Sequence, residues 1–443
     1  MDISNISIRS LLSERIAQEN IITHVTITET AITVDLKPHL TLTYERPDCQ
    51  ESVVAYYHDS ETVLCQGLGI QGKAVRYQVT NTRLGYLNDA GEFKTFTIPV
   101  PGMRANLFVT DEVITQFLYF NVNCDLSLAK TVDLLQEVYG IETSISAVER
   151  WKTAEAETLP SIGQIIKMLN EKKKITALHL DEYKATGTKS WELAIRDEHG
   201  RLLFSIRLKQ RDTWHIKAIL RWFRLLGLEI KIFYVDFWLA YPPAIKAIYP
   251  NADLQYDFFH IIQNIHRHLY RALTAYRKAF YNAKTVKEQA GLRKQLHKQL
   301  WQHRYLLFTN EENLTAEQRQ ILDQLLQDHA NTIVEQIVLF RQQLRVIFNE
   351  CDTFSVALEN LALLILEGWA DVSPHFSKIM SFLQKHIDHM LTYLRKPDVQ
   401  RNSLSECTVR SLRRLEKTRQ GFKTHKGRVN HLKLLQWNKY LRS

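Results

Sequence analysis

The hydrophobic pattern divides the chain into segments with different periods. Residues 21–100 alternate apolar and polar positions and are rich in β-branched residues, as in "HVTITETAITVDL" at 24–36. Such alternation is typical of strands with one buried face. After "PVPGM" at 99–103, which is expected to be a linker, apolar positions recur with the period of an α-helix. We therefore predict an N-terminal β-rich domain over 1–105 and a helical segment over 106–170.

Residues 127–151 are expected to form two helices separated by a short turn. The first helix should end at Gly140, and Thr143 or Ser144 would be the N-cap of the second. Trp151 would then face inward. This arrangement resembles a helix-turn-helix and indicates a DNA-binding segment. Two packed helices with no role in DNA binding are the alternative.

The pattern changes again in residues 171–264, which we expect to form the first part of an α/β domain. Three strands, a helix, an apolar strand, a short helix and a last strand follow one another. This order, β-β-β-α-β-α-β, is typical of the ribonuclease H-like fold and predicts a mixed sheet whose first and fourth strands are neighbours. The predicted elements are the strands 175–185, 190–209 (a hairpin), 230–238 and 252–260, and the helices 212–227 and 239–250.

An almost wholly helical segment separates this first part from the C-terminus. We expect an all-α insertion over 265–395, most clearly interrupted at 309–318, where Thr315 is placed to cap the next helix. Residues 396–443 would complete the core with a final helix that carries Glu406, followed by a basic tail. The predicted fold class is therefore α/β, with a large all-α insertion behind an N-terminal β-rich domain and a helical segment.

Two aspartates end apolar strands of the expected sheet. Asp181 lies near the end of the first strand, and Asp236 lies near the end of the fourth. Functional groups of open α/β sheets gather at the carboxyl ends of the strands, so the two side chains should face each other. Two carboxylates this close need a cation, and oxygen ligands of this kind suit Mg²⁺ or Mn²⁺. Alternatively, each aspartate merely ends a strand or caps a turn.

A third carboxylate is needed for phosphoryl transfer at two metal ions, and Glu406 is the candidate. It lies in the first turn of the last expected helix, within "RNSLSECTVRSLRR" at 401–414. Ser403 and Glu406 also have the spacing of a capping box, in which the glutamate bonds to the backbone instead. The two roles compete for the same side chain.

The positive charge of the chain is concentrated at its C-terminus. The formal net charge is +9, and residues 401–443 hold twelve Lys and Arg against two acids. Such a cluster is typical of a nucleic-acid binder, because cations neutralise phosphates and release counterions. A solvated basic tail is the alternative. The candidate DNA contacts are the basic residues that follow Glu406, namely Arg410, Arg413, Arg414, Lys417, Arg419, Lys423, Lys426 and Arg428.

Composition excludes several classes of protein. Hydrophobic residues make up 45% and charged residues 24% of the 443 residues, as in ordinary globular proteins. No apolar run is long enough to span a membrane, and the N-terminus lacks the pattern of a secretory signal. The five cysteines are scattered without a CxxC pair. We therefore expect no disulfide framework and no structural zinc, which fits a reducing cytoplasm.

With these residues identified, the chain resembles a DDE-type transposase of bacterial insertion sequences. The resemblance is to the branch in which a long all-helical insertion separates the second aspartate from the glutamate. "VDFWLAYPPAIKAIYPNADLQYDFFHII" (235–262) has the aromatic residue after the aspartate, the Tyr-Pro and the D-x-x-H of that branch. "NSLSECTVRSLRRLEKTRQGF" (402–422) has its Asn, Glu, basic run and Gly-Phe. The resemblance covers about residues 120–443.

This resemblance implies specific roles and a reaction. Asp181, Asp236 and Glu406 would be the catalytic residues and the ligands of two Mg²⁺ or Mn²⁺ ions, with Asp257 and His260 as an accessory motif. Water would cleave one strand at the element end, and the freed 3′-hydroxyl would attack target DNA. The implied partner is double-stranded DNA, bound by a homodimer or higher multimer in the bacterial cytoplasm, at the nucleoid.

Other interpretations remain open for single residues and for the whole chain. His260 could be a packed core residue, and Asp257 could be a helix cap. Trp238 could belong to the core or could stack on an unpaired base. Glu182 is a further candidate ligand, although strand alternation would point it to the other face. The chain could also be a domesticated DNA-binding protein with an inactive core, or a metal-dependent nuclease of the same fold that performs no joining step.

Overall fold

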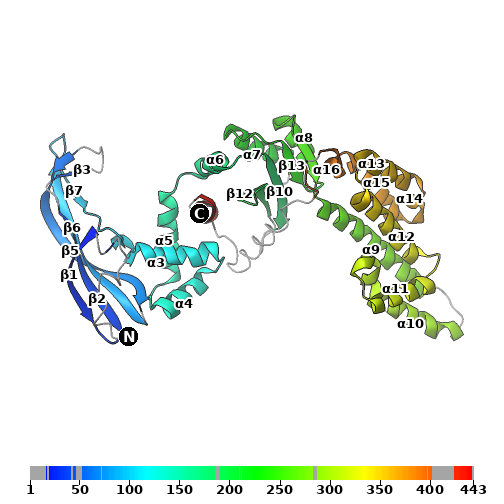
Figure 1. Ribbon diagram of the computed structural model, residues 1–443, viewed down its shortest axis with the longest axis horizontal. Helices are drawn as coiled ribbons and strands as arrows, with labels where there is room; N and C mark the ends of the chain where they lie inside the picture. Colours follow the sequence, from blue (N-terminus) through cyan, green and yellow to red (C-terminus); the bar gives the residue numbers. More distant parts are fainter. Residues whose placement is uncertain are drawn as a thin grey trace. The chain divides into compact units, whose positions relative to one another are not determined.

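The computed structural model forms two compact units (Figure 1). The first unit is built from residues within 1–169 and 411–443, and the second from residues within 170–184 and 189–410. The residues that the structure describes are 16, 19–40, 43–45, 52–70, 72–184, 190–208, 210, 212–282, 287–396, 398–401 and 424–441.

A seven-stranded mixed sheet dominates the first unit, as the alternating pattern of residues 21–100 predicts. Buried and partly exposed side chains alternate along β2, and Val34, Cys65 and Val79 fill the core behind it. The strand order is β1-β2-β6-β5-β9-β8, with β7 paired to β6, and β3 and β4 form a separate pair. The strands are β1 (Asn20–Ile27), β2 (Ala31–Pro38), β3 (Thr43–Glu45), β4 (Ser52–Val54), β5 (Tyr56–Ile70), β6 (Lys73–Leu87), β7 (Phe93–Thr97), β8 (Met103–Arg104) and β9 (Val109–Thr110).

The stretch 99–103, expected to be a linker, packs into this core instead. Val100 and Met103 are buried against the sheet, and Met103 begins β8. The Met103 N–H donates to the Val100 carbonyl at 3.0 Å, which closes a turn at Pro101 and Gly102. Proline and glycine therefore serve here to turn the chain back onto the sheet rather than to separate two domains.

Two helices of the first unit, α4 and α5, begin and end where the sequence predicts. α4 (Leu128–Tyr139) ends at Gly140, whose φ of 66° is left-handed, and α5 (Ile145–Thr158) begins after Ser144. The Ser144 hydroxyl accepts a hydrogen bond from the Ala147 N–H at 3.2 Å, and Trp151 is buried. The other helices are α3 (Asp111–Leu118), the following π-helical turn η3 (Tyr119–Asn123), α6 (Ile162–Lys172), and at the C-terminus α18 (His425–Gln436).

The second unit contains a five-stranded mixed sheet in the order β12-β11-β10-β13-β14. β10 pairs antiparallel with β11 and parallel with β13, and β13 pairs parallel with β14. The element order and the contact of the first strand with the fourth are both confirmed. The elements are β10 (Ala177–Lys184), β11 (Trp191–Asp197), β12 (Leu202–Leu208), α7 (Thr213–Leu225), β13 (Ile232–Val235), α8 (Tyr241–Ile248) and β14 (Asp253–Tyr256).

A long helical segment follows β14, as predicted (Figure 1). Thr315 forms a capping box with Gln318 at the start of α11, which confirms the expected cap. The helices are α9 (Phe258–Asn282), α10 (Lys287–His303), α11 (Ala316–Asp328), α12 (Ile333–Arg345), α13 (Phe354–Leu366), α14 (Trp369–Val372), α15 (Pro374–Met390) and α16 (Thr392–Arg395). Short turns lie between them, namely η4 (Arg304–Phe308), η5 (Glu311–Asn313) and η6 (Val346–Glu350).

The end of the helical segment is tied back to the sheet. The Gln255 side chain, on β14, donates to the Met390 carbonyl at 3.1 Å and accepts from the Tyr393 N–H at 2.9 Å. Val399 then packs beside Tyr234 of β13. The helices between residues 258 and 395 are thus an insertion that leaves the sheet and returns to it.

Two glycine substitutions should change stability in opposite directions. Gly140→Ala places a Cβ at a left-handed position and should destabilise the protein by about 1 kcal/mol. Gly291→Ala lies within α10, where an added Cβ meets no atom within 4 Å, and should stabilise by up to about 1 kcal/mol. Denaturant unfolding of both variants measures this. Equal changes in the free energy of unfolding of the two variants would show that the backbone of Gly140 is not held in the left-handed conformation.

Candidate active site

Three aspartates lie at the carboxyl edge of the second unit's sheet. His179 of β10 is opposite Tyr234 of β13, and Tyr234 is opposite Gln255 of β14. Asp181 lies two residues beyond His179 in β10, and Asp236 and Asp257 directly follow the last residues of β13 and β14. Neighbouring strands are only about 4.8 Å apart. Parallel pairing therefore gathers three carboxyl groups at one edge.

The electrostatics of Asp181 reflect this crowding. The residue is 5% exposed, and the pKa of its carboxyl is raised to about 6, chiefly by burial. The negative charges of Asp236 and Asp257 also act to raise this pKa. His260 acts in the opposite direction, with its Nε2 atom 3.8 Å from Asp181 Oδ1. Asp181 is therefore a carboxyl group whose ionised form is costly unless a positive charge lies beside it.

Asp236 and Asp257 also hold the chain that follows them. Asp236 Oδ1 accepts a hydrogen bond from the Trp238 N–H at 2.9 Å. Asp257 Oδ1 accepts one from the Phe259 N–H at 3.0 Å, and so caps α9. The helix-cap interpretation of Asp257 is thus confirmed, and it does not exclude a role beside Asp181, whose pKa Asp257 raises.

The prediction that the fifth strand extends to His260 is wrong. β14 ends at Tyr256, and α9 begins at Phe258. The apolar run through Phe258 and Phe259 favoured a strand, but the side chain of Asp257 satisfies the first N–H groups of a helix instead. His260 therefore lies in the first turn of α9, which brings its imidazole to Asp181.

Glu182 has a different partner from its neighbour Asp181. Its Oε1 atom accepts a hydrogen bond at 3.0 Å from the hydroxyl of Tyr241, which is fully buried at the start of α8. Burial raises the pKa of Tyr241 well above its usual range, and Glu182 adds to this effect. Sequence patterns identify Tyr241 only as part of the Tyr-Pro motif. Its buried bond to Glu182 needs the packing of α8 on the sheet.

The predicted C-terminal residues have different outcomes. Lys426 is exposed and donates to Glu157 Oε1 at 2.8 Å. Arg428, also predicted to contact DNA, is only 4% exposed. It lies on α18, which packs against α5, where Lys152 bonds to His431 at 3.0 Å. The remaining predicted residues, Glu406, Arg410, Arg413, Arg414, Lys417, Arg419 and Lys423, lie outside the described residues.

The described carboxylates suit a hard divalent cation but do not complete a site. Asp181 and Asp236 supply oxygen atoms, the ligands that Mg²⁺ and Mn²⁺ prefer. Across the described part of the chain, no group of three or more His, Cys, Asp or Glu side chains is arranged to hold a metal ion. In the same residues, no helix is long and apolar enough to cross a membrane.

Stability should fall with rising pH because of Asp181. Its folded-state pKa of about 6 lies above its ordinary value of 3.8. The folded protein therefore keeps a proton that the unfolded chain has lost, and stability decreases between about pH 4 and pH 6. Asp181→Asn should abolish this part of the decline in unfolding experiments without divalent ions. Asn at the exposed Asp323 is the control and should leave the decline unchanged. If the stability of Asp181→Asn fell with pH in parallel with that of the wild type, the raised pKa would not belong to Asp181.

Comparison with known proteins identifies the family to which the chain belongs. A family model described as a transposase, DDE_Tnp_ISL3, matches residues 178–427, more than half of the chain. The solved Drosophila P element transposase strand transfer complex is 11% identical, over 80% of this chain and 95% of that chain, with a TM-score of 0.37. A score this low does not establish a shared fold. No curated protein matches the chain. On the family match, the protein belongs to the DDE transposases.

Proposed function

We propose that this transposase cleaves the ends of its mobile element and joins the freed 3′-hydroxyl to target DNA by metal-dependent phosphoryl transfer. The observation that carries the proposal is the position of Asp181, Asp236 and Asp257 at one edge of the sheet, close enough for the charges of Asp236 and Asp257 to raise the pKa of Asp181. Crowded carboxylates at a strand edge are an unfavourable arrangement in a protein that does not bind a cation there.

The topology supports a ribonuclease H-like core. The order β12-β11-β10-β13-β14, with the first three strands antiparallel and the last three parallel, is the order expected for that fold. In this arrangement the first and fourth strands are central, and their carboxyl ends open at the same edge. The fold thus accounts for the position of Asp181 beside Asp236.

Asp181, Asp236 and Glu406 are proposed to hold the divalent ions. When bound, two such ions would stabilise the attacking and leaving oxygens of an in-line displacement at phosphorus. Asp181 and Asp236 would fix the position of the scissile phosphate relative to the sheet. Asp257 holds the first turn of α9, so that His260 faces Asp181 and offsets part of the negative charge.

The length of the chain is compatible with a role of Glu406 at this edge. The Gln400 N–H donates to the Tyr234 hydroxyl at 2.7 Å, on β13, two residues before Asp236. Six residues of chain can span up to roughly 20 Å, which is enough for Glu406 to reach the strand end. The competing interpretation of Glu406 is the capping box with Ser403.

Double-stranded DNA is the proposed partner, bound by a multimer. The basic residues that follow Glu406, from Arg410 to Lys426, are proposed to contact the backbone beside the cleaved bond. The helix pair α4 and α5 is the proposed reader of the element end, since its cap and turn have the geometry that a helix-turn-helix requires.

Removing either proposed ligand should abolish cleavage and spare binding. Asp236→Asn and Glu406→Gln should lower cleavage of duplex DNA made from the sequences flanking the gene, in Mn²⁺, by roughly a hundredfold or more. Their affinity for the same DNA should be unchanged or slightly higher, because a negative charge near phosphates is removed. Gel assays of cleavage and of binding measure both.

The matched control is Asp253→Asn. Asp253 lies at the start of β14, at the opposite end of that strand from Asp257, and pairs with the half-exposed Lys396 at 3.3 Å. This variant should cleave within about twofold of the wild type. Wild-type protein that binds but never cleaves would favour a domesticated DNA-binding protein, and cleavage without strand-transfer product on a supercoiled target would favour a nuclease.

A further inference from the structure

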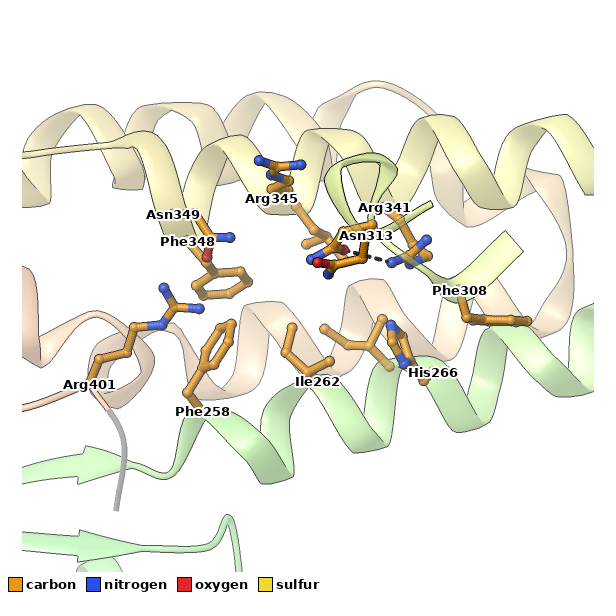
Figure 2. Close-up of a pocket in the computed structure, with 13 residues that line it drawn as sticks. Phe258, Ile262, His266, Phe308, Asn313, Arg341, Arg345, Phe348, Asn349 and Arg401 are labelled. Carbon is orange, nitrogen blue, oxygen red and sulfur yellow. Dashed lines mark hydrogen bonds between the residues drawn. The ribbon is translucent and has the colours of Figure 1, made fainter. Parts of the chain in front are cut away.

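A pocket of about 380 Å³ opens in the helical insertion beside the first turns of α9 (Figure 2). Its volume lies in the range of roughly 300–1,000 Å³ typical of sites for small molecules. Phe258, Ile262 and His266 line it at the i, i+4 and i+8 positions of α9, so they share one face of the helix. His260, two residues after Phe258, points to Asp181 from another face. One helix therefore borders both the carboxylate edge and the pocket.

The pocket has a cationic lining. Arg341, Arg345 and Arg401 contribute to it, and none of its lining residues is acidic. Burial lowers the pKa of Arg341 to about 10, and this side chain donates to the Leu307 carbonyl at 2.7 Å. Arg345 pairs with Glu312, which lies outside the lining. Among the described residues that line the pocket, no carboxylate pairs with Arg341 or Arg401, which favours an anionic ligand.

Arg401 is the least satisfied of the three arginines. Its guanidinium lies 3.5 Å above the centre of the Phe258 ring. Its Nε atom is buried and, among the described residues, has no hydrogen-bond partner. Because an unpaired buried donor is costly, a ligand that offers an acceptor here would be stabilised.

Aromatic rings supply the apolar part of the pocket. Phe258 and Phe348 meet edge to face with ring centres 5.3 Å apart, and Phe308 packs in the same way against His266 at 5.4 Å. Burial lowers the pKa of His266 to about 4, so this ring is neutral at physiological pH. Figure 2 shows Phe258 and His266 on α9, Phe348 on the facing side of the pocket, Arg341 and Arg345 above, and Arg401 beside Phe258. Flat apolar surfaces next to guanidinium groups are the means by which proteins hold the bases and phosphates of unpaired strands.

We propose that this pocket receives one unpaired nucleotide of the DNA strand bound at the carboxylate edge, with its base against Phe258 and Phe348 and its phosphate at Arg401. The inference rests on the proposed function, which places DNA at Asp181 and Asp236. Phe258 directly follows Asp257 in the chain, so the pocket begins at the same end of α9 as the carboxylate edge. The α-helical insertion would then keep the DNA near the cleaved bond from pairing again.

The test compares oligonucleotides that differ only in their bases. The full-length protein, without divalent ions, is titrated with a labelled oligodeoxythymidylate and with an abasic oligonucleotide of equal length and charge. The wild type should bind the thymidine strand about ten- to a hundredfold more tightly, the range expected for stacking of a base on an aromatic ring. Phe258→Leu and Arg401→Gln should each remove most of this preference.

The chain offers a matched control outside the pocket. Arg395 lies over the ring of Phe354 at 4.5 Å, the same kind of contact as Arg401 over Phe258, and neither Arg395 nor Phe354 lines the pocket. Phe354→Leu and Arg395→Gln should keep the preference for bases. Equal affinity of the wild type for both strands, or an equal loss in the control variants, would overturn the proposal.

Photocrosslinking locates the contact even where a variant folds poorly. A wild-type complex with a 5-iodouracil oligonucleotide should crosslink to peptides that contain Phe258 or Phe348, and crosslinks elsewhere alone would refute the site. Competition by free thymidine monophosphate as strong as that by the oligonucleotide would show a site for free nucleotides instead. A wild type without base preference that still shows Asp236-dependent cleavage would refute this inference alone. An intact preference without cleavage would refute only the proposed function.

Discussion

Parallel pairing of β10, β13 and β14 is the constraint on which the rest of the second unit depends. The paired strands end at one edge, where Asp181 lies in β10 and Asp236 and Asp257 directly follow β13 and β14. Burial raises the pKa of Asp181, and the charges of Asp236 and Asp257 add to this effect. A strand register cannot shift by one residue without turning every buried side chain to the wrong face, so the apolar core holds the carboxyl groups at this edge despite their charges.

The helical insertion serves this edge through its first and last residues. α9 begins at the cap that Asp257 provides, which directs His260 to Asp181 and Phe258 to the pocket. The last helices return through hydrogen bonds to Gln255, and residue 400 ends beside β13. Insertion and sheet are therefore connected at the one place where chemistry is proposed, and the rest of the insertion is free to form a separate surface.

Local signals made much of this fold predictable from the sequence. The sequence predicts the helix caps at Ser144 and Thr315 and the order of the strands correctly. These features depend on neighbouring residues, through capping side chains and through alternating or continuous apolar runs. Features that depend on packing between distant parts of the chain could not be predicted from the sequence. The start of α9 was missed because an apolar run fits strand and helix equally well until a cap decides. The burial of Arg428 depends on α18 packing against α5, and the pocket joins residues from Phe258 to Arg401.

The most direct measurement is the structure of the protein with Mn²⁺ and a DNA end, read by the anomalous scattering of manganese. The proposed function predicts an anomalous peak between the carboxylates of Asp181 and Asp236, with Glu406 among the ligands. Absence of any peak at this edge, at a Mn²⁺ concentration that supports cleavage, would contradict the claim that the strand-end carboxylates form the catalytic centre.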